Sequence, residues 1–171
     1  MTNSTAWTSK QLQGRFAILL LLCIAALGSA RGADSGSVFS HEGTYASPTA
    51  RCMAELRANK ERGGTDLFVF NKQQQLILSR EDVNAAAWHQ NILYFSASPV
   101  YGKPGLFSFD CRTSNTRTLA KAQHKDAGYP DGSDYFELST VKGATIEYLY
   151  FPDVDKLTHH DQLQKKQIEL E

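Results

Sequence analysis

Apolar and polar residues alternate along most of the chain after residue 47, and this period of two is typical of strands with one buried face. Residues 52–58, CMAELRA, place the first, third and fifth residues on one side, and residues 145–151, TIEYLYF, alternate in the same way. The runs between them are rich in Val, Ile, Phe and Tyr and are separated by polar turns that contain Gly, Pro or Asn. The pattern predicts a mainly β domain over residues 47–157.

The segments on either side of this domain lack the β pattern. Residues 31–46 are small and polar, and we expect them to form a flexible leader. Residues 158–171 have no β-branched run, and Thr158 followed by Asp161 approximates a capping box. The expected architecture is an antiparallel meander that forms one curved or sandwich-like sheet, with a short C-terminal helix or tail.

A short motif occurs twice in the β domain. Residues 67–70 read LFVF, and residues 106–109, which lie 39 positions later, read LFSF. Each copy follows a polar, glycine-containing loop and precedes a short turn and a returning strand. A repeat of about 40 residues has the length of a four-stranded, blade-like unit. We therefore expect two similar units, over residues 47–78 and 91–119.

Residues 47–119 resemble the WD40-like repeats of the TolB type of β-propeller. Ser47-Pro48 opens a turn before a strand, and residues 66–70 and 106–110 match the later strand of that repeat. The Asp-Gly that usually follows Ser-Pro in the repeat is Thr-Ala in this chain. The resemblance implies blade-like units, but two or three units are too few to close a propeller, which typically has at least four.

The first 30 residues have the order of a secretory signal peptide. Lys10 and Arg15 precede a 13-residue apolar run, and small residues follow it. The run is shorter than the roughly 20 residues that a membrane-spanning helix needs; an uncleaved N-terminal anchor is the alternative. Cleavage before Arg31 or before Asp34 would release a single domain into the periplasm or out of the cell.

The charge balance of the mature chain argues against a nucleic-acid partner. The first 30 residues contain two of the 18 basic residues and no acidic residue, so 16 basic and 18 acidic residues remain. There is no basic stripe for a phosphate backbone and no polybasic cluster for acidic lipids. We expect no nucleic-acid partner and, after cleavage, no membrane span.

Cys52 and Cys111 are the two cysteines that remain after the signal peptide. An even number of cysteines in an exported chain favours a disulfide bond, which in this chain would link the two repeats. Two buried thiols are the alternative. A catalytic thiol is not indicated, because no histidine or asparagine accompanies either cysteine in a recognisable pattern.

The sequence offers little catalytic chemistry. It contains no nucleophile elbow, zinc-protease motif or phosphate-cradling glycine loop, so we expect no catalytic residue, cofactor or metal site. His159 and His160 are adjacent, and adjacent side chains diverge on a helix. Asp131, Asp134 and Glu137 carry enough oxygen atoms for a calcium ion, but their spacing does not follow the calcium-binding loop pattern, so a polar turn is expected.

Tyrosines in the loops and at the strand ends are the best candidates for binding, because tyrosine offers a large contact area at low entropic cost. The candidate binding residues are Tyr101, Tyr129, Asp131, Asp134 and Tyr135. The expected function is an exported, non-catalytic β domain that binds another protein or an envelope component, in an inhibitor, immunity-type or accessory role. One alternative is a small secreted hydrolase that uses the acidic residues of loop 126–137. Another is a structural subunit that oligomerises through edge strands.

Overall fold

The structure is a computed structural model and describes residues 31–32, 36–125 and 128–170. The predicted signal peptide, residues 1–30, lies outside the described residues. Strands dominate, as predicted, and the helical elements of the described part are two short 3-10 turns, Val154–Lys156 and His160–Gln162. No helix in the described ranges is long and apolar enough to cross a membrane.

The first sheet has five strands in the order β1-β3-β4-β5-β6. β1 pairs with β3 in parallel, and all other neighbours pair antiparallel. Its strands are β1 (Arg31–Gly32), β3 (Gly43–Ala46), β4 (Cys52–Ala58), β5 (Thr65–Asn71) and β6 (Leu76–Arg80).

The second sheet, in the order β10-β9-β8-β7-β2, and the third, in the order β11-β12-β13, are antiparallel throughout. The second sheet comprises β2 (Val38–Phe39), β7 (Val83–His89), β8 (Ile92–Ala97), β9 (Gly105–Asp110) and β10 (Asn115–Lys121). The third comprises β11 (Tyr135–Lys142), β12 (Thr145–Phe151) and β13 (Gln164–Glu169). The predicted antiparallel meander is confirmed, but the strands divide among three sheets rather than forming one.

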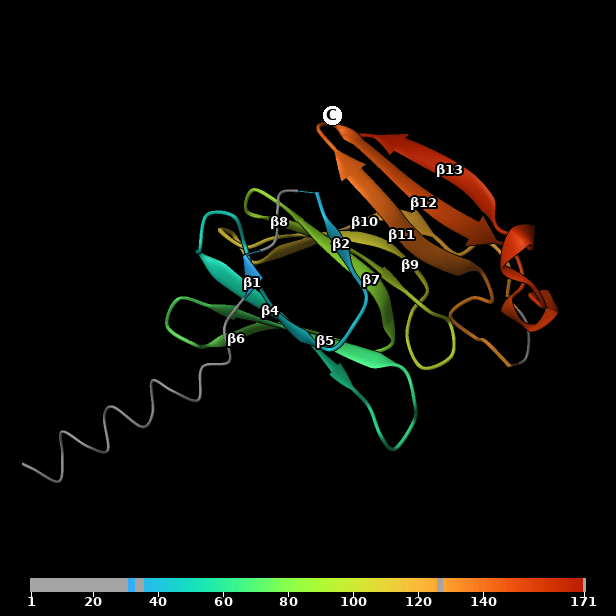
Figure 1. Cartoon of the computed structure of the whole chain (residues 1–171). Coiled ribbons are helices and arrows are strands. Elements are labelled where there is room, and N and C mark those ends of the chain that lie inside the picture. Colours follow the sequence, from blue (N-terminus) through green and yellow to red (C-terminus); the bar gives the residue numbers. More distant parts are fainter. Residues whose placement is uncertain (1–30, 33–35, 126–127, 171) are drawn as a thin grey trace, which may run out of the picture. The chain divides into compact units, whose positions relative to one another are not determined.

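The second sheet lies between the other two (Figure 1). Its strands β7, β8 and β9 are mostly buried, whereas the edge strand β10 is mostly exposed. Along β8, Leu93 and Phe95 belong to the core cluster shared with the first sheet, whereas Tyr94 belongs to the cluster shared with the third sheet. The largest buried side chain of the first cluster, Trp88, is fully buried and donates its indole N–H to the Tyr45 carbonyl at 3.0 Å. Apolar burial on both faces explains why β7, β8 and β9 are richer in apolar residues than β10.

The predicted disulfide is present and links the first two sheets. Cys52 begins β4 and Cys111 follows β9, and their Cα atoms are 6.3 Å apart. Both residues are buried in the cluster between these sheets. The bond therefore joins the two repeats, as predicted from the cysteine count.

The two copies of the repeated motif occupy corresponding strands. LFVF lies in β5, the third strand of the meander β3–β6, and LFSF lies in β9, the third strand of the meander β7–β10. Their surroundings differ, because Phe68 and Phe70 are half-buried on the face of the first sheet that points away from the core, whereas Phe107 and Phe109 are buried between two sheets.

Two segments differ from the expectations for the chain ends. Residues 31–46, expected to be a flexible leader, contain β1, β2 and β3, and the Tyr45 ring stacks on Phe39 with centroids 3.9 Å apart. Aromatic burial and pairing with β4 and β7 outweigh the weak local β pattern of this segment.

The predicted C-terminal helix is wrong for residues 164–169, which form β13 along the edge of β12. Ile168 packs against the second core cluster, and the Lys166 ammonium lies 3.7 Å from the centroid of the Tyr150 ring. These contacts and the ladder to β12 stabilise a strand where the helical amphipathic pattern is weak.

Candidate functional site

A groove of about 600 Å³ brings together three of the five predicted binding residues. Residues 79–81 at the end of β6, residues 99–103 between β8 and β9, and residues 128–131 ahead of β11 line it. Tyr101, Tyr129 and Asp131 all belong to this lining. The loops that follow strands of different sheets therefore converge on one surface depression.

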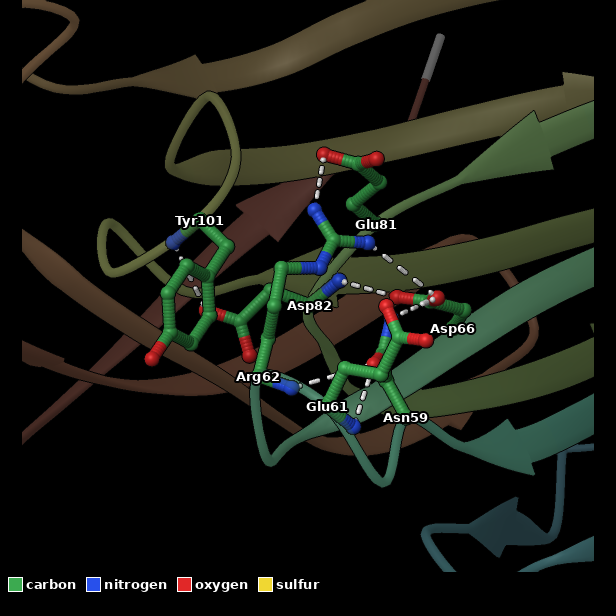
Figure 2. Close-up of polar contacts among 7 residues, drawn as sticks. All are labelled: Asn59, Glu61, Arg62, Asp66, Glu81, Asp82 and Tyr101. Atoms are coloured by element: carbon green, nitrogen blue, oxygen red, sulfur yellow. Dashed lines mark hydrogen bonds and ion pairs between the residues drawn. The ribbon is translucent and has the colours of Figure 1, made fainter.

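Asp82 holds the Tyr101 loop in place (Figure 2). It lies in the connection between β6 and β7, is buried, and adopts a φ of 53°, which turns the chain from the first sheet into the second. Its carbonyl accepts a hydrogen bond from the Ser98 amide at 2.8 Å, and its carboxylate accepts one from the Tyr101 amide at 3.3 Å. The backbone of Tyr101 is thus fixed while the residue remains 44% exposed.

Arg62 lies beside the Tyr101 ring, with its guanidinium carbon 5.7 Å from the ring centroid. The Nη1 atom is 2.9 Å from a carboxylate oxygen of Glu81, and Nη2 is 3.5 Å from Asp66 (Figure 2). The hydrogen bond to Glu81 raises the pKa of Arg62, which keeps this side chain a cation. Exposed pairs of this kind contribute little to stability, so the contacts chiefly orient the side chains.

The loop between β4 and β5 places Arg62 through its own hydrogen bonds. The Asn59 side-chain oxygen accepts from the amides of Glu61 at 3.1 Å and Arg62 at 3.2 Å, and its nitrogen donates to Asp66 at 2.9 Å. Gly64 has a φ of 75°, and a Cβ at this position would lie 2.6 Å from an Asp82 carboxylate oxygen. Glycine is therefore required where this loop approaches Asp82.

Tyr129 and Asp131 line the groove from the segment ahead of β11. The Tyr129 hydroxyl donates a hydrogen bond to the Asp155 carboxylate at 2.8 Å, and this bond connects the loop to the 3-10 turn after β12. Asp131 is exposed. The groove therefore presents two tyrosines and two exposed carboxylates, Glu81 and Asp131, in addition to the cations Arg80 and Lys103.

Asp134 is not part of the groove and is fully buried. Its carboxylate accepts hydrogen bonds from the amides of Gln123 and His124 at 2.8 Å each, from the His124 ring at 2.9 Å, and from the Tyr150 hydroxyl. Burial by itself would raise the pKa of Asp134, but the hydrogen bonds from Tyr150, His124 and Gln123 together lower it. The carboxylate is an anchor for the segment that enters β11.

Tyr135 also lies outside the groove, in β11. Its hydroxyl donates to Glu137 at 2.8 Å, and burial together with this hydrogen bond raises its pKa. Of the acidic residues proposed for a hydrolase, Asp134 and Glu137 are thus engaged by neighbouring side chains, and Asp131 alone among these three lines the groove.

Sequence reasoning missed Arg62, Arg80 and Asp82. Each is a single charged residue in a polar turn or at a strand end, and no motif distinguishes it from a solvated surface residue. Within the described ranges, no group of three or more His, Cys, Asp or Glu residues is placed to hold a metal ion.

Comparisons with known proteins establish no family. No protein-family model matches the chain, and no curated protein matches it. Among solved structures, the chain is similar to the β-propeller domain of the Trilobed protease from Pyrococcus furiosus, with 14% identity and a TM-score of 0.38. The match covers 79% of this chain and 55% of that one, so the chain spans about half the length of the similar structure. The TolB-type resemblance of residues 47–119 stays a prediction.

Proposed function

We propose that the chain is an exported, non-catalytic β domain that binds another protein through the groove lined by Tyr101 and Tyr129. The observation that carries the proposal is the placement of Tyr101. Its ring is exposed, yet its backbone is held by Asp82 and its ring lies beside Arg62. An aromatic residue that is already fixed loses little conformational entropy on binding, and tyrosine is enriched at such surfaces.

Export is supported by the cysteine chemistry. A disulfide between Cys52 and Cys111 persists in the periplasm or outside the cell, where the environment is oxidising. The segment that would direct export, residues 1–30, carries the signal-peptide pattern described above. A periplasmic or secreted binding domain is the role that agrees with both features.

Site-specific photo-crosslinking tests the proposal. A photoreactive phenylalanine analogue at Tyr101 should give a discrete crosslinked species in an extract of the cell envelope and medium. The same analogue at Thr118, an exposed position on β10 outside the groove lining, is the matched control. Equal crosslinking at both positions, or none at Tyr101, would contradict the proposal.

Two substitutions of the same residue separate ring contact from folding. Tyr101→Phe keeps the ring and should retain the partner, whereas Tyr101→Ala removes the ring and should weaken binding at least tenfold, as expected for an aromatic contact at the centre of an interface. Both variants should unfold at the same urea concentration as the wild type, because the side chain is 44% exposed. A partner that binds Tyr101→Ala as tightly as wild type would show that the groove is not the binding site.

A further inference from the structure

Arg80 is a cation in the groove that has no anionic partner among the described residues. It ends β6 and lines the groove, and its Nε atom is buried with no hydrogen-bond partner there. Its guanidinium carbon lies 4.5 Å from the centroid of the Phe107 ring. Burial lowers the pKa of Arg80, and no nearby carboxylate opposes this effect.

The neighbouring acidic groups are already engaged or lie apart. Glu81 is paired with Arg62, and Asp82 accepts the amide of Tyr101. Asp131 is exposed and lines the groove, and no ion pair joins it to Arg80. Arg80 therefore lines the groove without an ion-pair partner among the described residues, and its guanidinium is available to an external anion.

Lys103 supplies a second cation to the same groove. It is exposed, lies in the β8–β9 loop, and forms no ion pair with any residue in the part of the chain that the structure describes. Arg80 and Lys103 are thus the two groove cations without an ion-pair partner among the described residues, whereas Glu81 is paired with Arg62. A protein partner can supply the anion for these two cations as the carboxylate of an Asp or Glu side chain.

We infer that the groove binds a carboxylate of the partner protein, carried by an acidic segment that packs on Tyr101 while Arg80 and Lys103 hold the charge. The inference rests on the proposed binding function and adds the chemical class of the ligand. An arginine whose face contacts an aromatic ring keeps the edge of its guanidinium for a carboxylate, which it can bind through two hydrogen bonds.

Fluorescence anisotropy with labelled peptides tests the inference. The probes are hexaglutamate and, as the neutral control of equal length, hexaglutamine, each titrated with the disulfide-bonded domain at pH 7.5 and low salt. The wild type should bind hexaglutamate at least tenfold more tightly than hexaglutamine. Equal binding of the two peptides would overturn the inference.

Three variants assign the effect to the groove. Arg80→Gln should remove the preference for hexaglutamate, and Lys103→Gln, at an exposed position where folding is not at risk, should reduce it severalfold. Arg51→Gln is the matched control, because Arg51 is an exposed arginine outside the groove lining and should leave the preference unchanged. The inference would be contradicted if both groove variants kept the wild-type preference for hexaglutamate, or if Arg51→Gln lost that preference to the same extent as Arg80→Gln.

Competition distinguishes the source of the negative charge. Acetate should displace hexaglutamate at lower concentration than inorganic phosphate does; the reverse order would identify a phosphate site and overturn the carboxylate assignment. Crosslinking at Tyr101 separates this outcome from the proposed function. A partner that crosslinks equally in the wild type and in Arg80→Gln refutes the carboxylate contact but leaves the binding function intact. Absence of crosslinking at Tyr101 in the otherwise wild-type domain refutes both.

Discussion

Removal of the disulfide between Cys52 and Cys111 should lower the free energy of unfolding by about 4 kcal/mol. The cysteines are 59 positions apart, and a cross-link closing a loop of that length lowers the entropy of the unfolded chain by roughly 14 cal/mol/K in the chain-entropy model. At 25 °C this entropy corresponds to about 4 kcal/mol. The effect arises in the unfolded state, so the native strands should be unchanged.

Urea denaturation followed by the fluorescence of the buried Trp88 measures this difference. The slope of the free energy against urea is about 1–3 kcal/mol/M for domains of this size, so the midpoint should fall by roughly 2 M. The difference between oxidised and reduced wild type measures the effect of the cross-link alone. The double variant Cys52→Ala/Cys111→Ala also includes the loss of packing at these two buried positions. A difference below about 1 kcal/mol between oxidised and reduced wild type would refute the loop-entropy reasoning.

Three further substitutions test the contacts that organise the domain. Asp134→Asn should lower the free energy of unfolding by about 2–4 kcal/mol, because it weakens four hydrogen bonds to a buried carboxylate. Since the pKa of Asp134 is lowered in the folded state, the carboxylate stabilises the fold above its unfolded pKa, and this stabilisation is lost as pH falls through the folded pKa. Urea titrations at several pH values should therefore show a smaller loss of stability below about pH 4 in the variant than in the wild type. Trp88→Phe should lower the free energy of unfolding, measured by calorimetry, by about 2–3 kcal/mol. The smaller ring leaves a cavity, and the Tyr45 carbonyl loses its hydrogen-bond donor. Gly64→Ala should lower the melting temperature more than Gly63→Ala, since both glycines have a φ of 75° but only Gly64 approaches Asp82; equal shifts would contradict the close-contact argument.

The strands that the periodicity predicted are those with one buried face. β4 and β12 alternate between buried and half-buried positions over most of their length, so a period of two in the local sequence is sufficient to identify them. How the strands divide into sheets depends on features that periodicity does not encode. The left-handed backbone at Asp82, for example, directs the chain from the first sheet into the second.

The two repeated motifs illustrate the same limit at the level of side chains. Phe68 and Phe107 stand at matching positions of the repeat, yet one lies on an outer face and the other between two sheets. β13 is a further case, because its strand conformation depends on a ladder to β12, and no local pattern in its sequence indicates that partner. Long-range packing therefore decides the environment that local propensity leaves open.

The tyrosines that line the groove could be singled out from the sequence, but the pairing of its charged side chains could not. The sequence Ser-Arg-Glu-Asp at residues 79–82 indicates an arginine with two adjacent carboxylates to neutralise it. The fold separates them, because Glu81 turns to Arg62 and Asp82 to the amide of Tyr101, which leaves Arg80 unpaired among the described residues. Each of these contacts joins residues 19 positions apart, a separation at which charge patterning along the chain gives no information. Arg80 is adjacent to a carboxylate in the sequence but has no ion-pair partner among the described residues, and this is apparent only once the loops have been placed. The unpaired arginine is the observation from which we infer that the groove binds a carboxylate.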